Sequence, residues 1–225
     1  MRGYLRIGWL AVLILSCSSA FAADKTWAVA AKAGSLGVGA DIHRVIFPDR
    51  LNLRVGFSFF QRAQNFTNSG IRYTGTFRVG GIPVSLDAYP FKNWFRVQAG
   101  MLVDLNRLTG TGQFRTDVVS SGLITIGAHS YTPDSIGSLQ GTVNVDRVSP
   151  FLGLGIGNPI KKDKRWGIFF DIGAIYHGAP TLNLQTTRSF PASLPADLNA
   201  QEQIFTNNTH RYIFYPIVQL GVSFR

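Results

Sequence analysis

Several segments of the chain alternate apolar residues with polar ones. Charged residues of both signs occur on the polar face of these segments, which we expect to point inward. An arginine fork can hold two carboxylate oxygens, whereas an unpaired buried charge is costly, so we expect these side chains to pair. These residues predict a polar network inside the fold, and Gln219 is a further candidate member. The network either packs the interior or lines a path for a solute. The candidates are Asp41, Arg54, Asp87, Arg96, Arg147 and Asp171.

Histidine, serine and acidic residues give weaker signals for chemistry. His43 and His177 are expected to face inward, and the sequence contains neither the spacing of a metal-binding helix nor a CxxC pair, so we predict no metal and no cofactor. His129, Ser130 and Asp134 form the one candidate set for lipid-modifying catalysis, but loops are generally rich in such residues. Asp197 and Glu202 are isolated in the sequence, so we predict no catalytic residues and no enzyme.

The segment from Phe95 to Asn106 shows the element that must position these residues. Its odd-numbered residues are all apolar, and its even-numbered residues are polar, charged or glycine apart from Leu102. One apolar and one polar face are typical of a strand in a barrel that is closed within lipid. The same pattern recurs at Leu36–Ile42, Leu51–Phe59, Ile71–Tyr89 (with a predicted β-bulge near Gly80), Thr142–Gly157, Trp166–His177 and Tyr212–Arg225.

These segments make seven strands, whereas single-chain bacterial barrels usually have an even number. Thr26–Lys32 also alternates and supplies the eighth, so the predicted fold is all-β: a single antiparallel transmembrane β-barrel of eight strands. Short connections near Pro48, Pro90 and Lys161 alternate with longer ones, of which the longest are 107–139 and 178–210. The long ones are predicted to be external loops, with a small hairpin at 123–132.

Aromatic residues near strand ends are expected at the membrane interfaces, where a ring can be apolar at one end and hydrated at the other. Trp94, Trp166, Tyr176 and Tyr212 are the principal candidates. The formal net charge of +10 could suit nucleic acid, but no nucleic-acid-binding motif is present and the basic residues are scattered. Anionic lipid head groups are the better-matched partner.

The first 22 residues are typical of an export signal. Arg2 and Arg6 precede the short apolar stretch Ile7–Leu15, and Ala20-Phe21-Ala22 forms a cleavage site. A lipoprotein signal at Cys17 is the competing interpretation, although the preceding residues fit it poorly. We therefore expect a signal peptide at 1–22 that is cleaved, an outer-membrane β-barrel at 23–225, and a location in the bacterial outer membrane.

Three glycine-rich motifs resemble a family of small, uncharacterised Gram-negative outer-membrane β-barrel proteins. The motifs are Lys32–Asp41, Pro150–Asn158 and Lys162–Gly167, the last continuing to Asp171-Ile172-Gly173. The resemblance implies insertion by the barrel-assembly machinery. Family members typically end in an aromatic residue, so the ending Phe224-Arg225 predicts less efficient assembly.

The predicted role is envelope structure or interaction at the cell surface, by a barrel whose polar lumen is plugged. An interior of eight strands is just wide enough for side chains to fill it. The alternative is a narrow channel for small solutes, as in the outer-membrane protein W family, which has a similar size and strand plan. A lipid-modifying enzyme is the third possibility. No surface partner follows from the sequence.

Overall fold

The computed structural model describes residues 26–225 apart from 69–70, 115–122, 161–164 and 189–190. The predicted signal peptide and its cleavage site lie outside these residues, as does part of the short connection predicted near Lys161. Within the described residues, no helix is long and apolar enough to cross a bilayer.

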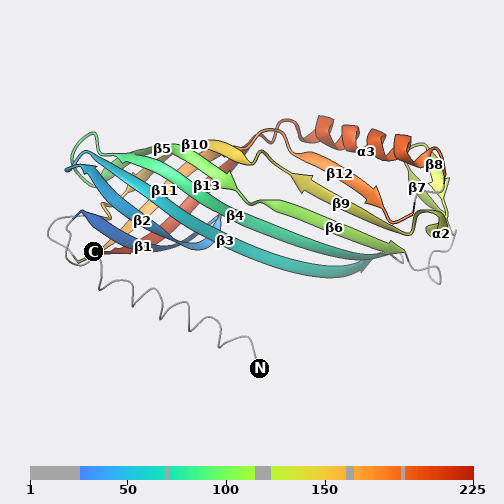
Figure 1. Cartoon of the computed structure of the whole chain (residues 1–225), viewed down its shortest axis with the longest axis horizontal. Coiled ribbons are helices and arrows are strands. Elements are labelled where there is room, and N and C mark those ends of the chain that lie inside the picture. The colour runs from blue at the N-terminus through green and yellow to red at the C-terminus, as the bar shows by residue number, and fades with distance from the viewer. Residues whose placement is uncertain (1–25, 69–70, 115–122, 161–164, 189–190) are drawn as a thin grey trace, which may run out of the picture.

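Eight antiparallel strands close into a barrel (Figure 1). β1 pairs with β13 through Val29 and Phe224, and β4 pairs with β5 through Leu86 and Ala99, so the sheet returns on itself. The predicted fold class and the eighth strand near Thr26 are therefore confirmed. The barrel strands are β1 (Trp27–Gly34), β2 (Gly37–Phe47), β3 (Leu51–Asn68), β4 (Ile71–Ala88), β5 (Phe95–Asp104), β10 (Val148–Ile156), β11 (Trp166–Tyr176) and β13 (Phe214–Phe224).

The outer surface of the barrel is apolar, as the alternating pattern predicted. Leu152 on β10 is 66% exposed, whereas Phe151 beside it is 7% exposed and points inward. Closure satisfies the backbone hydrogen bonds, and an apolar exterior is stable in a hydrocarbon environment. Other large apolar side chains on this outward face are Val38, Val55, Leu86, Leu154, Ile168, Ile172 and Leu220.

The barrel strands β3 and β4 continue beyond the barrel into a second, ordered part of the same sheet. β6 (Arg107–Phe114) pairs with the distal half of β4, β9 (Ser138–Asn144) pairs with β6, and β12 (Thr181–Thr186) pairs with β9. Together with β3 these strands form the extension, at the end of the molecule opposite the short turns (Figure 1). The segments 107–139 and 178–210, which the sequence predicts to be external loops, thus contain strands that lengthen the barrel wall.

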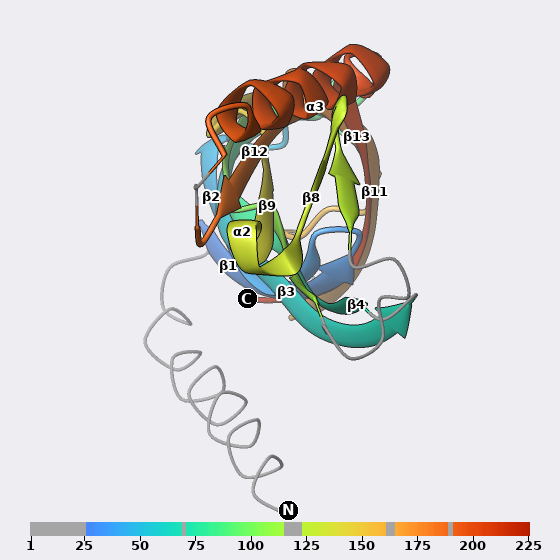
Figure 2. The ribbon, with the colours of Figure 1, turned by 90° about the vertical axis from the view of Figure 1, so that its right-hand side faces the viewer.

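Helical and hairpin segments cover the extension. Helix α3 (Leu194–Thr209) lies along β12, and the hairpin of β7 (Ile124–Ile126) and β8 (His129–Tyr131) lies at the tip beside α2 (Pro133–Ile136) (Figure 2). This hairpin confirms the one predicted at 123–132. An apolar cluster joins these elements, so the tip has its own small core: Ile126, Tyr131, Ile136, Leu194 and Leu198.

The change of apolar face near Gly80 in β4 has a different origin from the predicted β-bulge. The register between β3 and β4 is the same on both sides, because Val84 lies opposite Val55 and Gly80 lies opposite Phe59. Val79 is buried in the barrel interior, where an apolar side chain is required. The apolar pattern switches because the lumen itself becomes apolar at this height.

Candidate functional site: the charged network in the lumen

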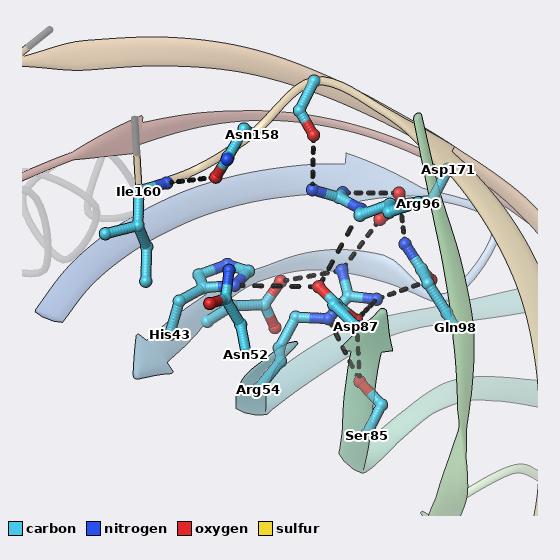
Figure 3. Close-up of polar contacts among 12 residues, drawn as sticks. His43, Asn52, Arg54, Ser85, Asp87, Arg96, Gln98, Asn158, Ile160 and Asp171 are labelled. Atoms are coloured by element: carbon cyan, nitrogen blue, oxygen red, sulfur yellow. Dashed lines mark hydrogen bonds and ion pairs between the residues drawn. The ribbon is translucent and has the colours of Figure 1, made fainter. Parts of the chain in front are cut away.

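Asp171 on β11 is the centre of a charged network inside the barrel (Figure 3). Its Oδ1 accepts hydrogen bonds from Arg96 Nη2 and Gln98 Nε2, both at 2.6 Å, and its Oδ2 accepts one from Arg54 Nη1 at 2.8 Å. The donors come from β3 and β5, which the barrel's closure brings close to β11. Hydrogen bonds between ionised groups are among the strongest in proteins, so this carboxylate joins three strands.

Arg54 carries the network across to the neighbouring strands. Its Nη2 donates to Gln98 Oε1 at 2.6 Å and lies 3.5 Å from Asp87 Oδ1, and its Nε donates to Ser85 Oγ at 3.3 Å. Arg96 donates from Nη1 to the carbonyl oxygen of Gly157 at 2.9 Å. Every guanidinium nitrogen of Arg54 thus has a polar neighbour, which compensates for the loss of water.

Lys32 completes the charge balance of the lumen. Its Nζ lies 2.6 Å from Asp41 Oδ1, and both side chains are buried. Lys32 is not among the predicted lumen residues, although the alternation of Trp27, Val29 and Ala31 places it on the inward face. The buried network therefore contains equal numbers of cations and carboxylates: Lys32, Arg54 and Arg96 with Asp41, Asp87 and Asp171.

The structure corrects the prediction for Arg147. This residue is exposed in the bend before β10, and its carbonyl oxygen accepts a hydrogen bond from the backbone N–H of Asp104. The predicted strand 142–157 is interrupted at 145–147 between β9 and β10, so inward alternation does not extend through Arg147. Gln219, also predicted to face inward, is buried on β13.

Phe169 and His43 pack beside the network. The Arg96 guanidinium lies 5.0 Å from the centre of the Phe169 ring, within the range of a cation–π contact. His43 is fully buried and meets the same ring edge-on, with centroids 6.0 Å apart. This confirms that His43 faces inward. Within the described residues, no group of three or more His, Cys, Asp or Glu side chains is arranged to hold a metal.

An apolar layer lies in the lumen on the side of the charged network that faces the extension. Along β5 the inward residues run from Arg96 through Gln98 and Gly100 to Leu102, so Leu102 lies nearer the extension than the charges. The one apolar exception in the alternating segment is therefore a lumenal residue that is 1% exposed. The layer consists of Leu36, Val79, Leu102, Phe151, Ile175 and Ile217, with Tyr215 packed against it.

The predicted interfacial aromatics are all exposed. Trp94 and Trp166 lie near the short turns, whereas Tyr176 and Tyr212 lie at the level where the extension begins. The Tyr176 and Phe214 rings contact each other, with centroids 5.6 Å apart. This arrangement in two groups suits the two interfaces of a bilayer, and the interfacial role of these residues stays a prediction.

Asp197 on α3, which looks isolated in the sequence, binds the β7–β8 hairpin. Its Oδ2 accepts hydrogen bonds from Tyr131 Oη at 2.5 Å and pairs with His129 Nδ1 at 2.8 Å. Ser130 Oγ is hydrogen-bonded to Thr125 at 3.1 Å, so the predicted set of His129, Ser130 and Asp134 is not assembled. Glu202 is not isolated either, because its Oε1 accepts the backbone N–H of Leu184.

We expect the contact between Asp197 and the β7–β8 hairpin to make the extension sensitive to acid. Hydrogen bonds from Tyr131 and His129 lower the pKa of Asp197. A carboxyl group whose pKa is lower in the folded state stabilises the fold at pH values above the ordinary aspartate pKa. That stability is lost as the pH falls through the pKa of the folded state. Hydrogen–deuterium exchange of α3, corrected for intrinsic rates, should therefore show protection that falls severalfold below a pH of about 4.

The matched variants separate this contact from general acid effects. Asp197→Asn should lose protection at neutral pH and flatten the profile, whereas Asp134→Asn, an exposed position on α2, should behave as the unmodified protein does. An unchanged α3 profile in Asp197→Asn would show that the carboxylate does not hold the helix.

Comparison with known proteins finds similarity to solved structures only. No family model and no curated protein matches the chain. Two solved structures from Acinetobacter baumannii are similar, CarO2 with a TM-score of 0.53 and CarO with 0.52, each 20% identical in sequence. Each alignment covers 88% of this chain, and 97% and 96% of the respective structures.

The similarity extends over the barrel and much of the extension, since most of both chains is aligned, and at this identity it shows the fold. It agrees with the resemblance that the glycine-rich motifs indicated. This chain therefore has the eight-stranded antiparallel barrel fold of small Gram-negative outer-membrane β-barrel proteins.

Proposed function

We propose that the protein is an integral outer-membrane barrel with a sealed lumen, which serves envelope structure and presents its extension for surface interaction. The apolar exterior supports placement in a bilayer, and the export signal at 1–22, which we propose is cleaved, supports the route. Lipid around the barrel and the assembly machinery during insertion are the proposed partners.

The observation that carries the sealed lumen is the apolar layer over the charged network. Leu36, Leu102 and Ile175 are 1%, 1% and 0% exposed, so side chains occupy the cross-section. An eight-stranded barrel has little interior beyond what side chains fill. A hydrated ion crossing this layer would lose its water without finding polar partners, which is strongly unfavourable.

The network below the layer favours the same conclusion. Asp171 already accepts three hydrogen bonds, and the charges balance within the lumen. A solute would have to displace these pairs to pass. The rival function, a narrow channel, needs both layers to rearrange.

The test is single-channel conductance of the refolded mature protein in a planar bilayer. We expect no discrete steps from protein shown to be folded by its heat-dependent gel mobility. Arg96→Ala should stay silent and become less stable. Discrete steps that Arg96→Ala alters would overturn the sealed lumen and favour the channel.

A further inference from the structure

Two arginines lie next to each other on the outward face of the wall, where the barrel meets the extension. Arg78 on β4 is directly opposite Arg107 on β6, and residues in that relation share one face of a sheet. The Arg78 guanidinium lies 5.9 Å from the centre of the Phe59 ring, and its Nε and Nη2 donate to Gln61 Oε1 at 3.3 and 3.2 Å. Phe59 and Gln61 alternate with the lumenal Ser58, so the arginine pair faces outward.

This arginine pair has no carboxylate to balance it. Both side chains are exposed, and neither forms an ion pair with an acid among the described residues. β6, β9, β12 and the parts of β3 and β4 beyond the barrel contain no Asp or Glu. Like charges directly opposite each other in a ladder are destabilising, and an anion between them would remove the repulsion. Because an arginine fork binds phosphate through two parallel hydrogen bonds, the pair suits a phosphate group.

The outward face on the barrel side of the pair is apolar. Val55 and Phe57 on β3 and Ile82 and Val84 on β4 are all exposed there. A surface of this kind is stable against acyl chains. The arginine pair therefore lies at the level where acyl chains end and charged head groups begin.

The outward face on the other side of the pair is polar and uncharged over two rows of directly opposite residues. The rows cross β4, β6, β9 and β12, which lie side by side in the extension (Figure 1). They are Thr76, Thr109, Thr142 and Asn183, followed by Thr74, Thr111, Gln140 and Gln185.

The side chains of these rows are available to a ligand. Apart from a hydrogen bond between Gln185 and Asn183, they have no side-chain partner among the described residues. Helix α3 packs on the other face of the sheet, where Leu184 contacts the apolar cluster of the tip. Hydroxyl and amide groups both donate and accept hydrogen bonds, and they repeat here at the spacing of neighbouring strands, about 4.8 Å. Such a surface matches the hydroxyl groups of sugars.

We propose that this outward face binds a phosphorylated glycolipid of the outer leaflet. Arg78 and Arg107 hold a phosphate group, and the two polar rows bind the sugars beyond it. The wall runs from apolar residues through arginines to hydroxyl and amide groups, which is the order of acyl chains, phosphates and sugars in such a lipid. The inference rests on the proposed function, in which the barrel lies in the outer membrane with its extension outside.

Native mass spectrometry of the mature protein in detergent measures the binding. The probes are lipopolysaccharide with its core sugars, lipid A, which has the phosphates without the core, and phosphatidylglycerol. We expect lipopolysaccharide to bind about tenfold more tightly than phosphatidylglycerol, with lipid A between them, because each adds hydrogen bonds that the next lacks. Equal affinity for the three probes would overturn the glycolipid as the ligand.

Three variants test the arginine pair. Arg78→Gln and Arg107→Gln should each weaken lipopolysaccharide binding about tenfold, the effect of losing one hydrogen bond between charged groups. Arg62→Gln is the matched control, because Arg62 is exposed in the same extension but lies opposite Phe77, on the other face of the sheet. It should leave the affinity unchanged. Equal losses in all three variants would show an effect of net charge alone and would overturn the site.

A double variant tests the polar rows. Thr76→Val combined with Thr109→Val removes two neighbouring hydroxyl groups and keeps the branched side chains that suit a strand. We expect severalfold weaker binding of lipopolysaccharide and unchanged binding of lipid A. Unchanged binding of lipopolysaccharide would overturn the role of the rows.

Labelling of intact cells separates this inference from the proposed function. Asp134→Cys places a thiol on α2 at the tip, away from the outward face, and the only native cysteine, Cys17, lies in the predicted signal peptide. A membrane-impermeant maleimide should label this variant in intact cells. Labelling in lysates alone, with lipopolysaccharide binding intact, would contradict the proposed location of the extension. Labelling of intact cells by a protein that does not bind lipopolysaccharide would overturn the inference alone.

Discussion

Replacing Asp171 with alanine should lower the free energy of unfolding by about 3–5 kcal/mol, the usual cost of removing one partner from a buried ion pair. The carboxylate accepts hydrogen bonds from Arg54, Arg96 and Gln98. Without it the lumen would hold one unbalanced positive charge, and the guanidinium groups of Arg54 and Arg96 would each lose their shortest ion pair. Urea unfolding of the protein in liposomes, followed by tryptophan fluorescence, measures the loss.

A double-mutant cycle distinguishes the pair from general damage. Arg54→Met combined with Asp171→Leu restores equal charge, so the combined loss should be smaller than the sum of the single losses by about 0.5–3 kcal/mol. Asp134→Ala, at an exposed position on α2, serves as the control and should lower the free energy of unfolding little. If Asp171→Ala costs less than about 1 kcal/mol, the network does not stabilise the barrel as we describe.

Gly39→Ala should destabilise the barrel by about 1–3 kcal/mol through overpacking. Gly39 on β2 lies opposite Ser58 on β3, and a Cβ there would be 1.8 Å from the carbonyl oxygen of Phe57. That oxygen belongs to the backbone of a paired strand and cannot move aside without breaking the ladder. The same urea titration measures the effect.

Gly110→Ala is the matched control, because both glycines lie within strands of one sheet. A Cβ at Gly110 on β6 would meet nothing within 4 Å. Alanine also restricts the unfolded chain, so this variant should be neutral or gain up to about 1 kcal/mol. Equal losses in the two variants would show that close strand approach at Gly39 is not the cause.

The barrel follows from local pattern. Alternation along Phe95–Asn106 requires one face in lipid and one inside, and a strand with those faces must close upon others to satisfy its backbone. The same alternation carries Asp41, Arg54, Asp87, Arg96 and Asp171 inward, where the structure places them. Strand periodicity of two residues makes this predictable without knowledge of any neighbour.

Periodicity gave a wrong result where the strand itself is interrupted. Arg147 was counted into a continuous strand, but the break at 145–147 leaves it exposed. The alternation along β1 places Lys32 on the inward face, but its pairing with Asp41 depends on the register of β1 against β2. The alternation along one strand does not fix that register, because the register is set by the pairing of neighbouring strands.

The sequence by itself determined the class of the molecule: its strands, its lipid-facing surface and the charges it carries inside, all of which depend on alternation over a few residues. Tertiary structure alone decided which charges meet, that Leu102 and Phe151 pack in an apolar layer next to them, and that Asp197 holds the hairpin from 66 residues beyond Tyr131. These are contacts between residues distant in the chain. Their geometry depends on strand register and barrel closure, which local patterns leave open.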